Sequence, residues 1–232
     1  MSAPLAAPFS PGEALSPTGF DRVAWCYDAL AGVVFGRAQR RAQRAALAGL
    51  PAGAPHLLIL GGGTGWVLLE VLRRRPQATV LYLEASPRML ARARARLARE
   101  CPAAAHQVEF RHGTQAMLAP AEQFDSIVTF FVLDCLALPE LPKALAQLRL
   151  ALRPGATWLL ADFRPARRGW RWLLLKLMYA FFRLTTGLRA SELPALRPAL
   201  ARLGLEARDY GTYFGGAIEA VVFSGSPLSP GL

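Results

Sequence analysis

Short apolar runs alternate with segments whose hydrophobic positions recur every three or four residues along most of the chain. The apolar runs have the length of strands and lie near residues 56–60, 78–84, 107–111, 125–131 and 156–162. Helical periodicity is found near residues 65–75, 87–100, 139–152 and 168–185. Strands that alternate with helices in this way are typical of βαβ units, so the pattern predicts a mostly parallel sheet with helices on both faces.

The pattern changes on either side of this alternating region. After a short helix predicted near residues 191–203, two β-like runs at 206–213 and 217–224 are separated by a pair of glycines, which favours a hairpin at the sheet edge. Before the first strand, residues 20–50 have a helical pattern and predict two capping helices. The predicted fold class is therefore α/β: a Rossmann-like, doubly wound, mostly parallel seven-stranded sheet with a C-terminal β-hairpin and N-terminal capping helices.

A single domain is expected between two tails. Residues 1–17 are rich in Ala, Pro and Ser and predict a disordered tail rather than a signal peptide. Residues 18–224 are interpreted as one domain, in which residues 168–203 form a helical lid insertion. Residues 225–232 predict a second tail.

A glycine-rich turn follows the first predicted strand. The strand His56–Leu60 leads into Gly-Gly-Gly-Thr-Gly at residues 61–65, a helical pattern follows at once, and the next strand ends on Glu84. Glycine permits positive φ angles and close approach of a ligand, and the helix start presents unpaired N–H groups to an anion. An acid about twenty residues beyond such a turn can accept both hydroxyls of a ribose, so this unit predicts a nucleoside site.

The spacing of the glycines bears on which nucleoside is bound. A dinucleotide fingerprint would require a glycine at position 66, where this chain has Trp66. A bulky indole at the helix start leaves little space for a pyrophosphate. It is compatible with a ligand that presents an amino-acid carboxylate, such as S-adenosylmethionine.

Charge and composition narrow the partners only partly. The formal net charge is +11, from 27 basic and 16 acidic residues, and only Lys143 and Lys176 among the basic residues are lysines. Abundant arginine and alanine can reflect genomic base composition, so the charge is not taken as evidence for nucleic acid. An anionic membrane or an acidic ligand stays open as a partner.

The cysteines and histidines do not indicate a metal site or a disulfide scaffold. A small, odd number of cysteines fits a reducing, cytoplasmic compartment. Neither residue type shows metal-ligand spacing, and no Ser-His-Asp arrangement is evident. The residues considered are Cys26, Cys101, Cys135, His56, His106 and His112.

The stretch from Trp170 to Phe182 is apolar nearly all round, with Lys176 and Arg183 on one narrow stripe. It is shorter and more charged than a membrane span, which needs about 20 apolar residues. One interpretation is a helix packed on several sides. The other is a lid over a lipophilic substrate, or a helix that rests on a membrane surface.

The order of these pieces resembles the class I S-adenosylmethionine-dependent methyltransferases. Leu58–Gly65 is similar to the first motif of that family, and Leu83–Leu90 to its second-strand acid and the helix behind the adenine. Phe124–Phe130 is similar to the fourth strand, and Arg153-Pro-Gly155 to the turn before the fifth. The resemblance covers residues 20–163 and implies S-adenosylmethionine as the cofactor.

A narrower resemblance is to the ubiquinone/menaquinone C-methyltransferase group. It rests on Phe20-Asp-Arg-Val-Ala, on Tyr27-Asp28, on Asp162-Phe-Arg-Pro165 and on the late glycine pair. One position departs from the wider family, because Ile59 replaces the acid that usually stands two residues before the first glycine.

The turn and the resemblance together give a set of residues expected to hold the cofactor. Tyr27 is expected to close over it, and Thr114 and Gln115 take the place of the family's acid and can hydrogen-bond the adenine amino group. The full predicted set is Tyr27, Gly61, Gly62, Gly63, Gly65, Glu84, Ala85, Met89, Thr114, Gln115 and Phe130.

The acceptor is expected beside the loop after the fourth strand. Asp134 is the first candidate for a general base and Asp162 the second, although either can serve as a helix cap or a structural acceptor. Phe130 and Phe131 indicate an apolar acceptor pocket. The Asn/Asp-Pro-Pro-aromatic pattern of nucleic-acid amino methyltransferases is absent there. Cys135 follows an aspartate rather than the proline of a cytosine C5 nucleophile and is interpreted as a small buried residue.

The leading hypothesis is an S-adenosylmethionine-dependent methyltransferase that acts on a small, lipophilic acceptor, with no nucleic-acid partner and with peripheral membrane contact. One alternative is a nucleotide-dependent oxidoreductase, which Trp66 opposes. Another is a non-catalytic, methyltransferase-like protein that acts through its basic apolar helix at a membrane or partner, which Ile59 supports. An RNA methyltransferase would rest on net charge alone.

Overall fold

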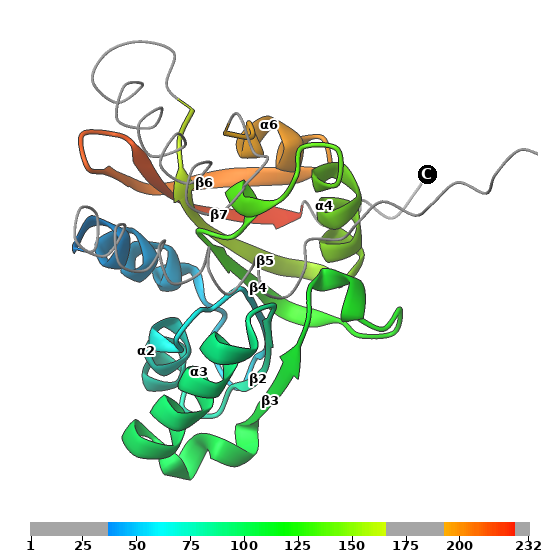
Figure 1. The fold of residues 1–232 in the computed structure, drawn as a ribbon. Coiled ribbons are helices and arrows are strands. Elements are labelled where there is room, and N and C mark those ends of the chain that lie inside the picture. Colours follow the sequence, from blue (N-terminus) through cyan, green and yellow to red (C-terminus); the bar gives the residue numbers. More distant parts are fainter. Residues whose placement is uncertain (1–36, 166–192, 226–232) are drawn as a thin grey trace, which may run out of the picture.

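The strand β1 lies at the centre of the sheet. Leu57, Leu58, Ile59 and Leu60 are all buried, because helices cover both faces of the sheet at this point. β1 pairs in parallel with β2 on one side and with β4 on the other. The structure, a computed structural model, describes residues 37–165 and 193–225 (Figure 1).

Seven strands form one sheet in the order β3-β2-β1-β4-β5-β7-β6. The strands are β1 His56–Leu60, β2 Thr79–Glu84, β3 Val108–His112, β4 Phe124–Phe130, β5 Leu152–Phe163, β6 Leu205–Tyr213 and β7 Ile218–Gly225. The first five strands are parallel, while β7 runs antiparallel to both β5 and β6. The predicted mostly parallel sheet with a C-terminal hairpin is confirmed.

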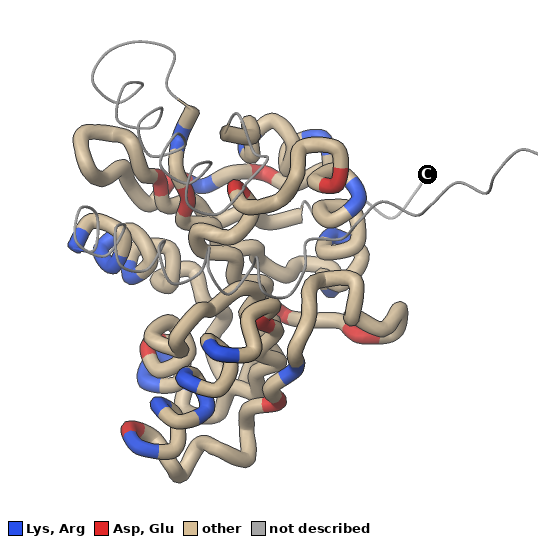
Figure 2. Tube along the Cα trace, in the orientation of Figure 1, with Lys and Arg blue, Asp and Glu red and all other residues tan. Residues whose placement is uncertain are grey.

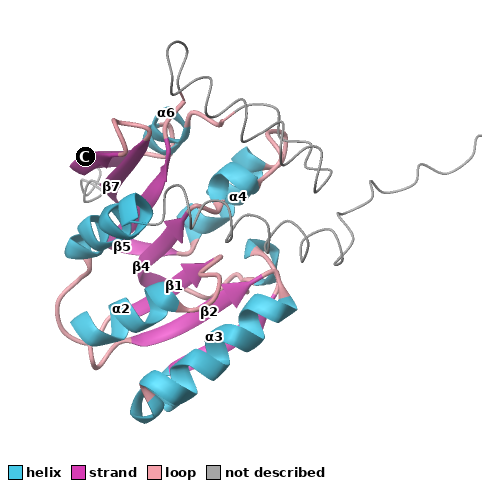
Figure 3. Ribbon diagram, turned by 60° about the vertical axis from the view of Figure 1, so that its left-hand side comes forward, coloured by secondary structure: helices cyan, strands magenta, loops and turns pink. Residues whose placement is uncertain are grey.

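Helices cover the sheet on both faces, as doubly wound folds require. They are α2 Trp66–Arg74, α3 Pro87–Glu100, α4 Leu141–Leu150 and α6 Leu196–Ala201. Residues 37–46 are also helical and are called helix 37–46 below. Helix 37–46, α2 and α3 share one hydrophobic core with one face of the sheet, and α4 and α6 share a second core with the other face (Figure 3).

The sequence explains where α3 begins and which side it buries. The side chain of Ser86 accepts a hydrogen bond from the backbone N–H of Met89 and caps the helix. Leu90, Ala93 and Leu97, spaced three and four residues apart, are buried against the sheet. The remaining positions are largely arginine and alanine and face outward.

The fifth strand begins earlier than the sequence predicts. The segment Arg153-Pro-Gly155, interpreted as a turn, lies inside β5, which starts at Leu152. The pairing of β4 with β5 shifts register between Phe124 and Ser126, and this irregularity accommodates the additional residues of β5.

Several predicted features lie outside the described residues. They are residues 1–17, residues 226–232 of the predicted second tail, Tyr27 and the stretch Trp170–Phe182. Gly225, predicted as the first residue of that tail, is instead the last residue of β7. Within the described residues, the end of the predicted lid insertion is α6, where Leu196 and Leu200 are buried in the core shared with α4. None of the helices in residues 37–165 and 193–225 has the length and apolar character needed to cross a membrane.

Candidate functional site

The predicted nucleoside site lies where the order of the sheet reverses. The chain leaves β1 for β2 on one side and reaches β4 on the other, so the loops at the carboxyl ends of β1 and β4 diverge. Ligands of open α/β sheets bind in the crevice at such a point. Residues 61–65, called the glycine loop below, occupy this position between β1 and α2.

Gly62 and Gly65 of the loop are required by protein neighbours on β2 and α3, and Gly61 is crowded by the side chain of Val132. A Cβ added at Gly62 would lie 2.5 Å from the ring of Tyr82, and one added at Gly65 would lie 2.9 Å from the backbone of Ala93 in α3. Tyr82 is fully buried, and its hydroxyl donates to the carbonyl of Gly63 over 2.8 Å. The absence of side chains at these two positions therefore allows the loop to pack closely on β2 and α3.

Gly63 has a different environment. Its φ angle is 62°, and a Cβ added there would meet only the sulfur of Met89, at 3.8 Å. The positive φ favours glycine here, and described protein atoms do not fill the space beside it as they do at Gly62 and Gly65. The space beside Gly63 and Met89 is where a ligand can approach the backbone of the loop.

Glu84 fixes the loop from the end of β2. The residue is 6% exposed, and its Oε2 accepts a hydrogen bond of 2.9 Å from the backbone N–H of Gly63. Its Oε1 accepts one of 2.9 Å from the N–H of Ser86, and its backbone carbonyl accepts one of 3.0 Å from Gly113. One carboxylate thus ties together the loops after β1 and β2.

The loop after β3 completes this side of the site. Gly113 has a φ angle of 142°, and the hydroxyl of Thr114 accepts from the N–H of Ala116 at the start of a short 3-10 turn that includes Gln115. Thr114 and Gln115 are half-buried. His112 is held by a 2.9 Å hydrogen bond between its Nε2 and the carbonyl of Ala85.

Two buried carboxyl groups lie on the other side, after β4 and at the end of β5. Asp134 is 5% exposed and Asp162 is fully buried. Oδ1 of Asp162 accepts from the N–H of Phe163 over 2.8 Å, whereas Oδ2 has no hydrogen-bond partner among the described residues. The side chains of Asp134 and Asp162 are called the carboxyl pair below.

Burial and mutual repulsion favour the protonated forms of the carboxyl pair. Desolvation raises the pKa of Asp134 to about 6, so Asp134 is largely ionised near neutral pH. Desolvation also raises the pKa of Asp162 well above its ordinary value. The charge of Asp134 adds to this shift, as does the charge of Glu219, which pairs with Asp162 in the register of β5 and β7.

Cys135 is adjacent to this pair and is chemically quiet. Its residue is half-buried, and its thiol donates to Oδ1 of Asp134 over 3.5 Å. Desolvation, and the charges of Asp134, Asp162 and Glu84, raise the pKa of the thiol well above its ordinary value. A thiol that stays protonated is a poor nucleophile, which agrees with a non-nucleophilic interpretation of Cys135.

Comparisons with known proteins agree with this geometry. Residues 58–158, from β1 into β5, match the family model described as a methyltransferase domain. Residues 58–158 thus match a methyltransferase domain and have the class I fold. Over 146 residues it is 31% identical to the ubiquinone/menaquinone biosynthesis C-methyltransferase UbiE of Paracoccus denitrificans, an alignment that covers 62% of this chain and 57% of the relative. The match therefore spans little more than half the length of this curated relative.

Solved structures show the same fold. An O-methyltransferase family protein from Burkholderia thailandensis has a TM-score of 0.65 at 17% identity, covering 89% of this chain and 60% of the other. Human N-acetylserotonin methyltransferase in complex with S-adenosylmethionine has a TM-score of 0.58 at 19% identity, covering 88% of this chain and 57% of the other. S-adenosylmethionine is the cofactor of this methyltransferase class.

The methyltransferase domain brings most of the predicted site residues to one edge of the sheet. Tyr27 lies outside the described residues. The residues at the carboxyl edge are Gly61, Gly62, Gly63, Gly65, Glu84, Ala85, Met89, Thr114, Gln115, Phe130, Asp134 and Asp162. The described residues contain no group of three or more His, Cys, Asp or Glu side chains that could hold a metal ion.

The structure shows strained backbone at Phe131, which the sequence already indicated for an apolar acceptor pocket. Its φ angle of 53° is unusual for a bulky residue, its N–H donates to the carbonyl of Ala161 over 2.9 Å, and its ring packs edge-on against Phe163 at 5.3 Å. Strained backbone of this kind clusters at ligand sites. The sequence carries no signal for it, because phenylalanine is not a residue that favours a positive φ.

One argument from the sequence needs correction. The guanidinium groups of Arg40 and Arg44 lie over the ring of Trp66 at 5.6 and 5.4 Å, so this indole packs toward helix 37–46. Its bulk is therefore no obstacle to a pyrophosphate in the glycine loop. The preference for S-adenosylmethionine over a dinucleotide rests on the domain match instead.

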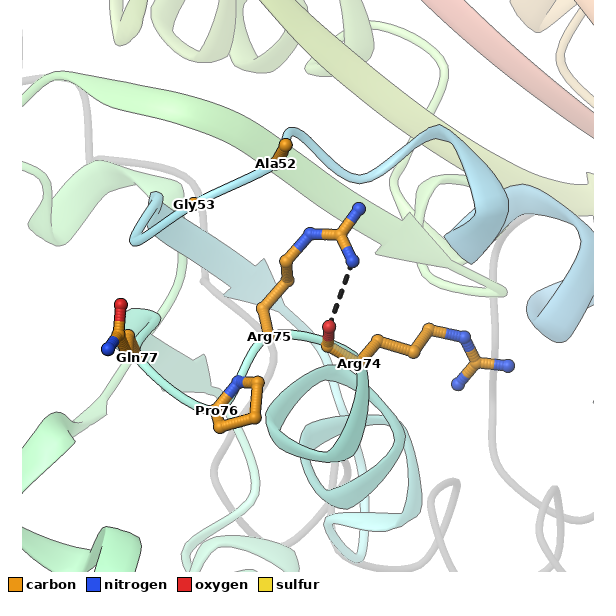
Figure 4. A pocket seen from close by; sticks show the side chains of 6 residues that line it. All are labelled: Ala52, Gly53, Arg74, Arg75, Pro76 and Gln77. Atoms are coloured by element: carbon orange, nitrogen blue, oxygen red, sulfur yellow. Dashed lines mark hydrogen bonds between the residues drawn. The ribbon is translucent and has the colours of Figure 1, made fainter.

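A surface recess of about 400 Å³ lies away from this edge. It is lined by Ala52, Gly53, Arg74, Arg75, Pro76 and Gln77 (Figure 4). These residues precede β1 and β2 or end α2, so the recess lies at the amino ends of the strands. It contains none of the predicted site residues, and the three nitrogens of the Arg75 guanidinium already donate to backbone carbonyls. We therefore place the site at the glycine loop.

Proposed function

We propose that the protein transfers a methyl group from S-adenosylmethionine to a small, lipophilic acceptor. The observation that carries the proposal is the cradle of Gly63 and Glu84, where an open backbone position is fixed by a buried carboxylate. The bound cofactor supplies an electrophilic methyl group on a sulfonium. The protein contributes position, exclusion of water, and a place for the proton that the acceptor loses.

The glycine loop and Glu84 hold the cofactor in this proposal. The backbone of Gly61, Gly62 and Gly63 approaches the methionine part, and Gly65 begins α2 so that its unpaired N–H groups face the carboxylate. The carboxylate of Glu84 is proposed to accept hydrogen bonds from the ribose hydroxyls, because an ionised carboxylate is an acceptor at both oxygens. Hydrogen bonds to a charged acceptor contribute about 1.5–3 kcal/mol each, which makes this carboxylate the strongest single contact expected.

Other predicted residues frame the rest of the cofactor. Ala85 and Met89 flank the ribose and adenine, Thr114 and Gln115 face the adenine amino group, and Phe130 closes the base of the site. Gln115 is the better acceptor for the adenine amino group, because the Thr114 hydroxyl already accepts a hydrogen bond from the N–H of Ala116. Tyr27 is proposed to close over the cofactor from the N-terminal segment.

The acceptor is proposed to lie between the glycine loop and the carboxyl pair. The strained Phe131 and its neighbour Phe163 line this region with aromatic surface, which favours an apolar molecule. Asp134 is proposed as the base because its pKa of about 6 leaves it ionised near neutral pH while burial keeps it a good proton acceptor. Asp162, whose raised pKa favours its neutral form, is proposed to position that charge.

The names of the relatives support a small-molecule acceptor. The curated relative acts in ubiquinone and menaquinone biosynthesis, and the human neighbour acts on N-acetylserotonin. The stretch Trp170–Phe182, with its apolar surface, is proposed to cover the acceptor as part of a lid. Peripheral membrane contact is proposed because of the same apolar stretch. A cytoplasmic location is proposed because the cysteines are few and odd in number.

A non-catalytic role remains the second candidate because of one residue. Ile59, at the position of the usual acid, is 1% exposed and packs in the core beneath α2, so it offers the cofactor no polar contact. Calorimetric titration with S-adenosylmethionine and, separately, with NAD tests both candidates. We expect binding of the first ligand alone, and no binding of either would leave only the non-catalytic role.

Turnover tests the acceptor class. Transfer of radioactive methyl from S-adenosylmethionine is followed into phenols and quinols that carry alkyl chains of increasing length. We expect incorporation that rises with chain length, because the site is lined with apolar side chains. Incorporation into RNA in place of these acceptors would contradict the proposal.

A further inference from the structure

The positive charge of the chain is concentrated in three helical segments. Residues 37–46, 66–75 and 87–100 contain twelve arginines and two glutamates, a net charge of +10. The rest of the chain has 15 basic and 14 acidic residues. Genomic base composition would scatter arginine over the whole chain, so composition alone does not account for this distribution.

The three segments form a continuous surface on one face of the molecule. Helix 37–46, α2 and α3 bury their apolar sides in the same core, against the same face of the sheet. Arg44 of helix 37–46 pairs with Glu70 of α2 at 3.4 Å, and Arg73 of α2 reaches Glu100 of α3 at 3.8 Å. Basic residues gather over these elements in Figure 2. This surface is called the basic face below.

The two acids of the basic face do not neutralise it. Glu70 pairs with three arginines, and Glu100 also pairs with three. Arg37, Arg41 and Arg92 are exposed and have no acidic partner within the described residues. A surplus of cationic groups therefore points to solvent, and such a surplus repels itself unless an anionic partner is present.

The chemistry of the face favours a lipid surface over a nucleic acid. The exposed positions between the arginines of α3 are alanines, Ala91, Ala95 and Ala98. The aromatic residue of these segments, Trp66, is covered by Arg40 and Arg44 and is not presented to a base. Single-strand and base recognition use exposed aromatic rings and amides, whereas an anionic bilayer requires only a broad cluster of basic side chains.

We propose that the basic face docks the protein on an anionic phospholipid surface. α2 and α3 begin at the glycine loop and at Ser86, so the edge of the basic face meets the edge of the sheet where the candidate site lies. If the acceptor is lipophilic, as proposed above, it would be dissolved in that same bilayer. The choice of a lipid bilayer as the anionic partner rests on that proposed function. The charge distribution that defines the basic face does not depend on it.

Vesicle co-sedimentation of the full chain tests the proposal. The probes are vesicles of equal parts phosphatidylglycerol and phosphatidylcholine, and vesicles of phosphatidylcholine alone. We expect the protein to bind the first and not the second, and to be released when salt shortens the range of the charges. Equal binding to both vesicles would overturn the proposal, as would binding to duplex DNA or RNA without binding to vesicles.

Matched variants locate the surface. Arg41→Glu with Arg92→Glu reverses two exposed charges of the basic face, and Lys143→Glu with Arg202→Glu makes the same change in net charge on exposed residues of α4 and after α6, which cover the opposite face. Each basic residue near an anionic surface contributes about fivefold in affinity, so we expect the first variant to lose about thirtyfold or more and the second only about threefold. Equal losses, or full binding by the first variant, would place the contact elsewhere and overturn the proposal.

The failure of the docking surface is distinguishable from failure of the proposed function. Calorimetry with S-adenosylmethionine and a thermal melt are run on both double variants, and we expect both measurements to match the parent. If the parent binds vesicles through the basic face but takes no S-adenosylmethionine, the docking surface stands and the proposed function falls. If the parent binds S-adenosylmethionine but never binds vesicles, the proposed function stands and the docking surface falls.

Discussion

The two sides of the carboxyl edge of the sheet treat their buried acids differently. On the side of β1 and β2, both oxygens of Glu84 accept backbone N–H groups, at 2.9 Å each. On the side of β4 and β5, Oδ2 of the fully buried Asp162 has no hydrogen-bond partner in the part of the chain that the structure describes. A satisfied acid makes a rigid binding surface, whereas an unsatisfied pair keeps its capacity to hold or move a proton. Binding is thus expected on one side and chemistry on the other.

The largest effect is expected at Gly63, on the binding side. Gly63→Val places a branched side chain where a ligand approaches the loop, and we expect S-adenosylmethionine affinity to fall more than about a hundredfold. Calorimetry measures the affinity. A variant that bound the cofactor like the parent would make the loop an ordinary turn and remove the basis of the comparison.

A matched pair of alanine variants separates strain from obstruction. Gly63 and Gly53 have similar φ angles of 62° and 79°, and a Cβ at Gly53 would meet nothing within 4 Å. Gly63→Ala and Gly53→Ala should therefore lose similar stability, about 1–2 kcal/mol from the left-handed backbone. We expect only Gly63→Ala to weaken cofactor binding. Equal affinities for the two variants would contradict the proposed site.

Asp134 gives the next largest effect, on the side where chemistry is expected. Asp134→Asn removes the proposed base, so turnover of an acceptor that must lose a proton should fall about 10²–10⁴-fold. Cofactor affinity should stay unchanged, because Asp134 lies across the edge from Glu84. In the parent, turnover should fall as the pH drops through about 6, where Asp134 becomes protonated. A flat pH profile between 5 and 8 would exclude Asp134 as the base.

Glu84→Ala should weaken cofactor affinity about tenfold or more, because two hydrogen bonds to a charged acceptor are lost. It should also lower stability, since the N–H groups of Gly63 and Ser86 lose their partner. Glu70→Ala is the control, because Glu70 is a similarly buried acid whose partners are arginines on the opposite side of α2 from the loop. It should cost stability and leave affinity intact.

Asp162→Asn should change stability in a way that depends on pH. A carboxyl whose pKa is raised by folding keeps a proton that the unfolded chain releases, so its contribution to stability declines as pH rises above about 4. The asparagine variant should therefore match the parent at pH 4 and be more stable at pH 8. Thermal or denaturant unfolding at both pH values measures this. A variant less stable at pH 8 would mean that Asp162 has an unseen partner.

Asp125 provides the control with the opposite sign. Burial favours its neutral form, but hydrogen bonds from the His56 N–H and from Arg153 outweigh burial and hold its pKa below the ordinary value. Its contribution to stability is present at neutral pH and declines as pH falls. Asp125→Asn should accordingly be less stable than the parent at pH 8 and approach it at low pH.

The sequence predicted the local geometry of the β1 and β2 side of the edge much better than that of the side with the carboxyl pair. The glycine loop and Glu84 have a fixed order and spacing, because a parallel strand, a tight turn and a helix must follow one another. The loop after β4 has no such constraint. The positive φ of Phe131 and the missing partner of Asp162 Oδ2 arise from contacts between β4, β5 and β7, which are distant in the sequence.

The location of the positive charge on the surface could not be predicted from the sequence either. The sequence gives the total of +11 but not its location, because helix 37–46, α2 and α3 become neighbours only when the sheet forms.

The start of β5 was missed for a related reason. A proline and a glycine near residue 154 predict a turn, and only the irregular pairing with β4 makes them part of a strand.

The smallest effect is expected at Cys135, which tests whether the β4 side uses its carboxyl groups or its thiol. Burial and the three neighbouring acids keep this thiol protonated, so it should react slowly with iodoacetamide at pH 8. Cys135→Ala should reduce turnover less than about threefold, since a weak thiol hydrogen bond to Asp134 is all that is lost. Mass spectrometry of the alkylated protein compares Cys135 with Cys101, which lies far from the site at the end of α3. A turnover loss as large as that of Asp134→Asn would assign the chemistry to the thiol and reverse the roles argued for this side of the sheet.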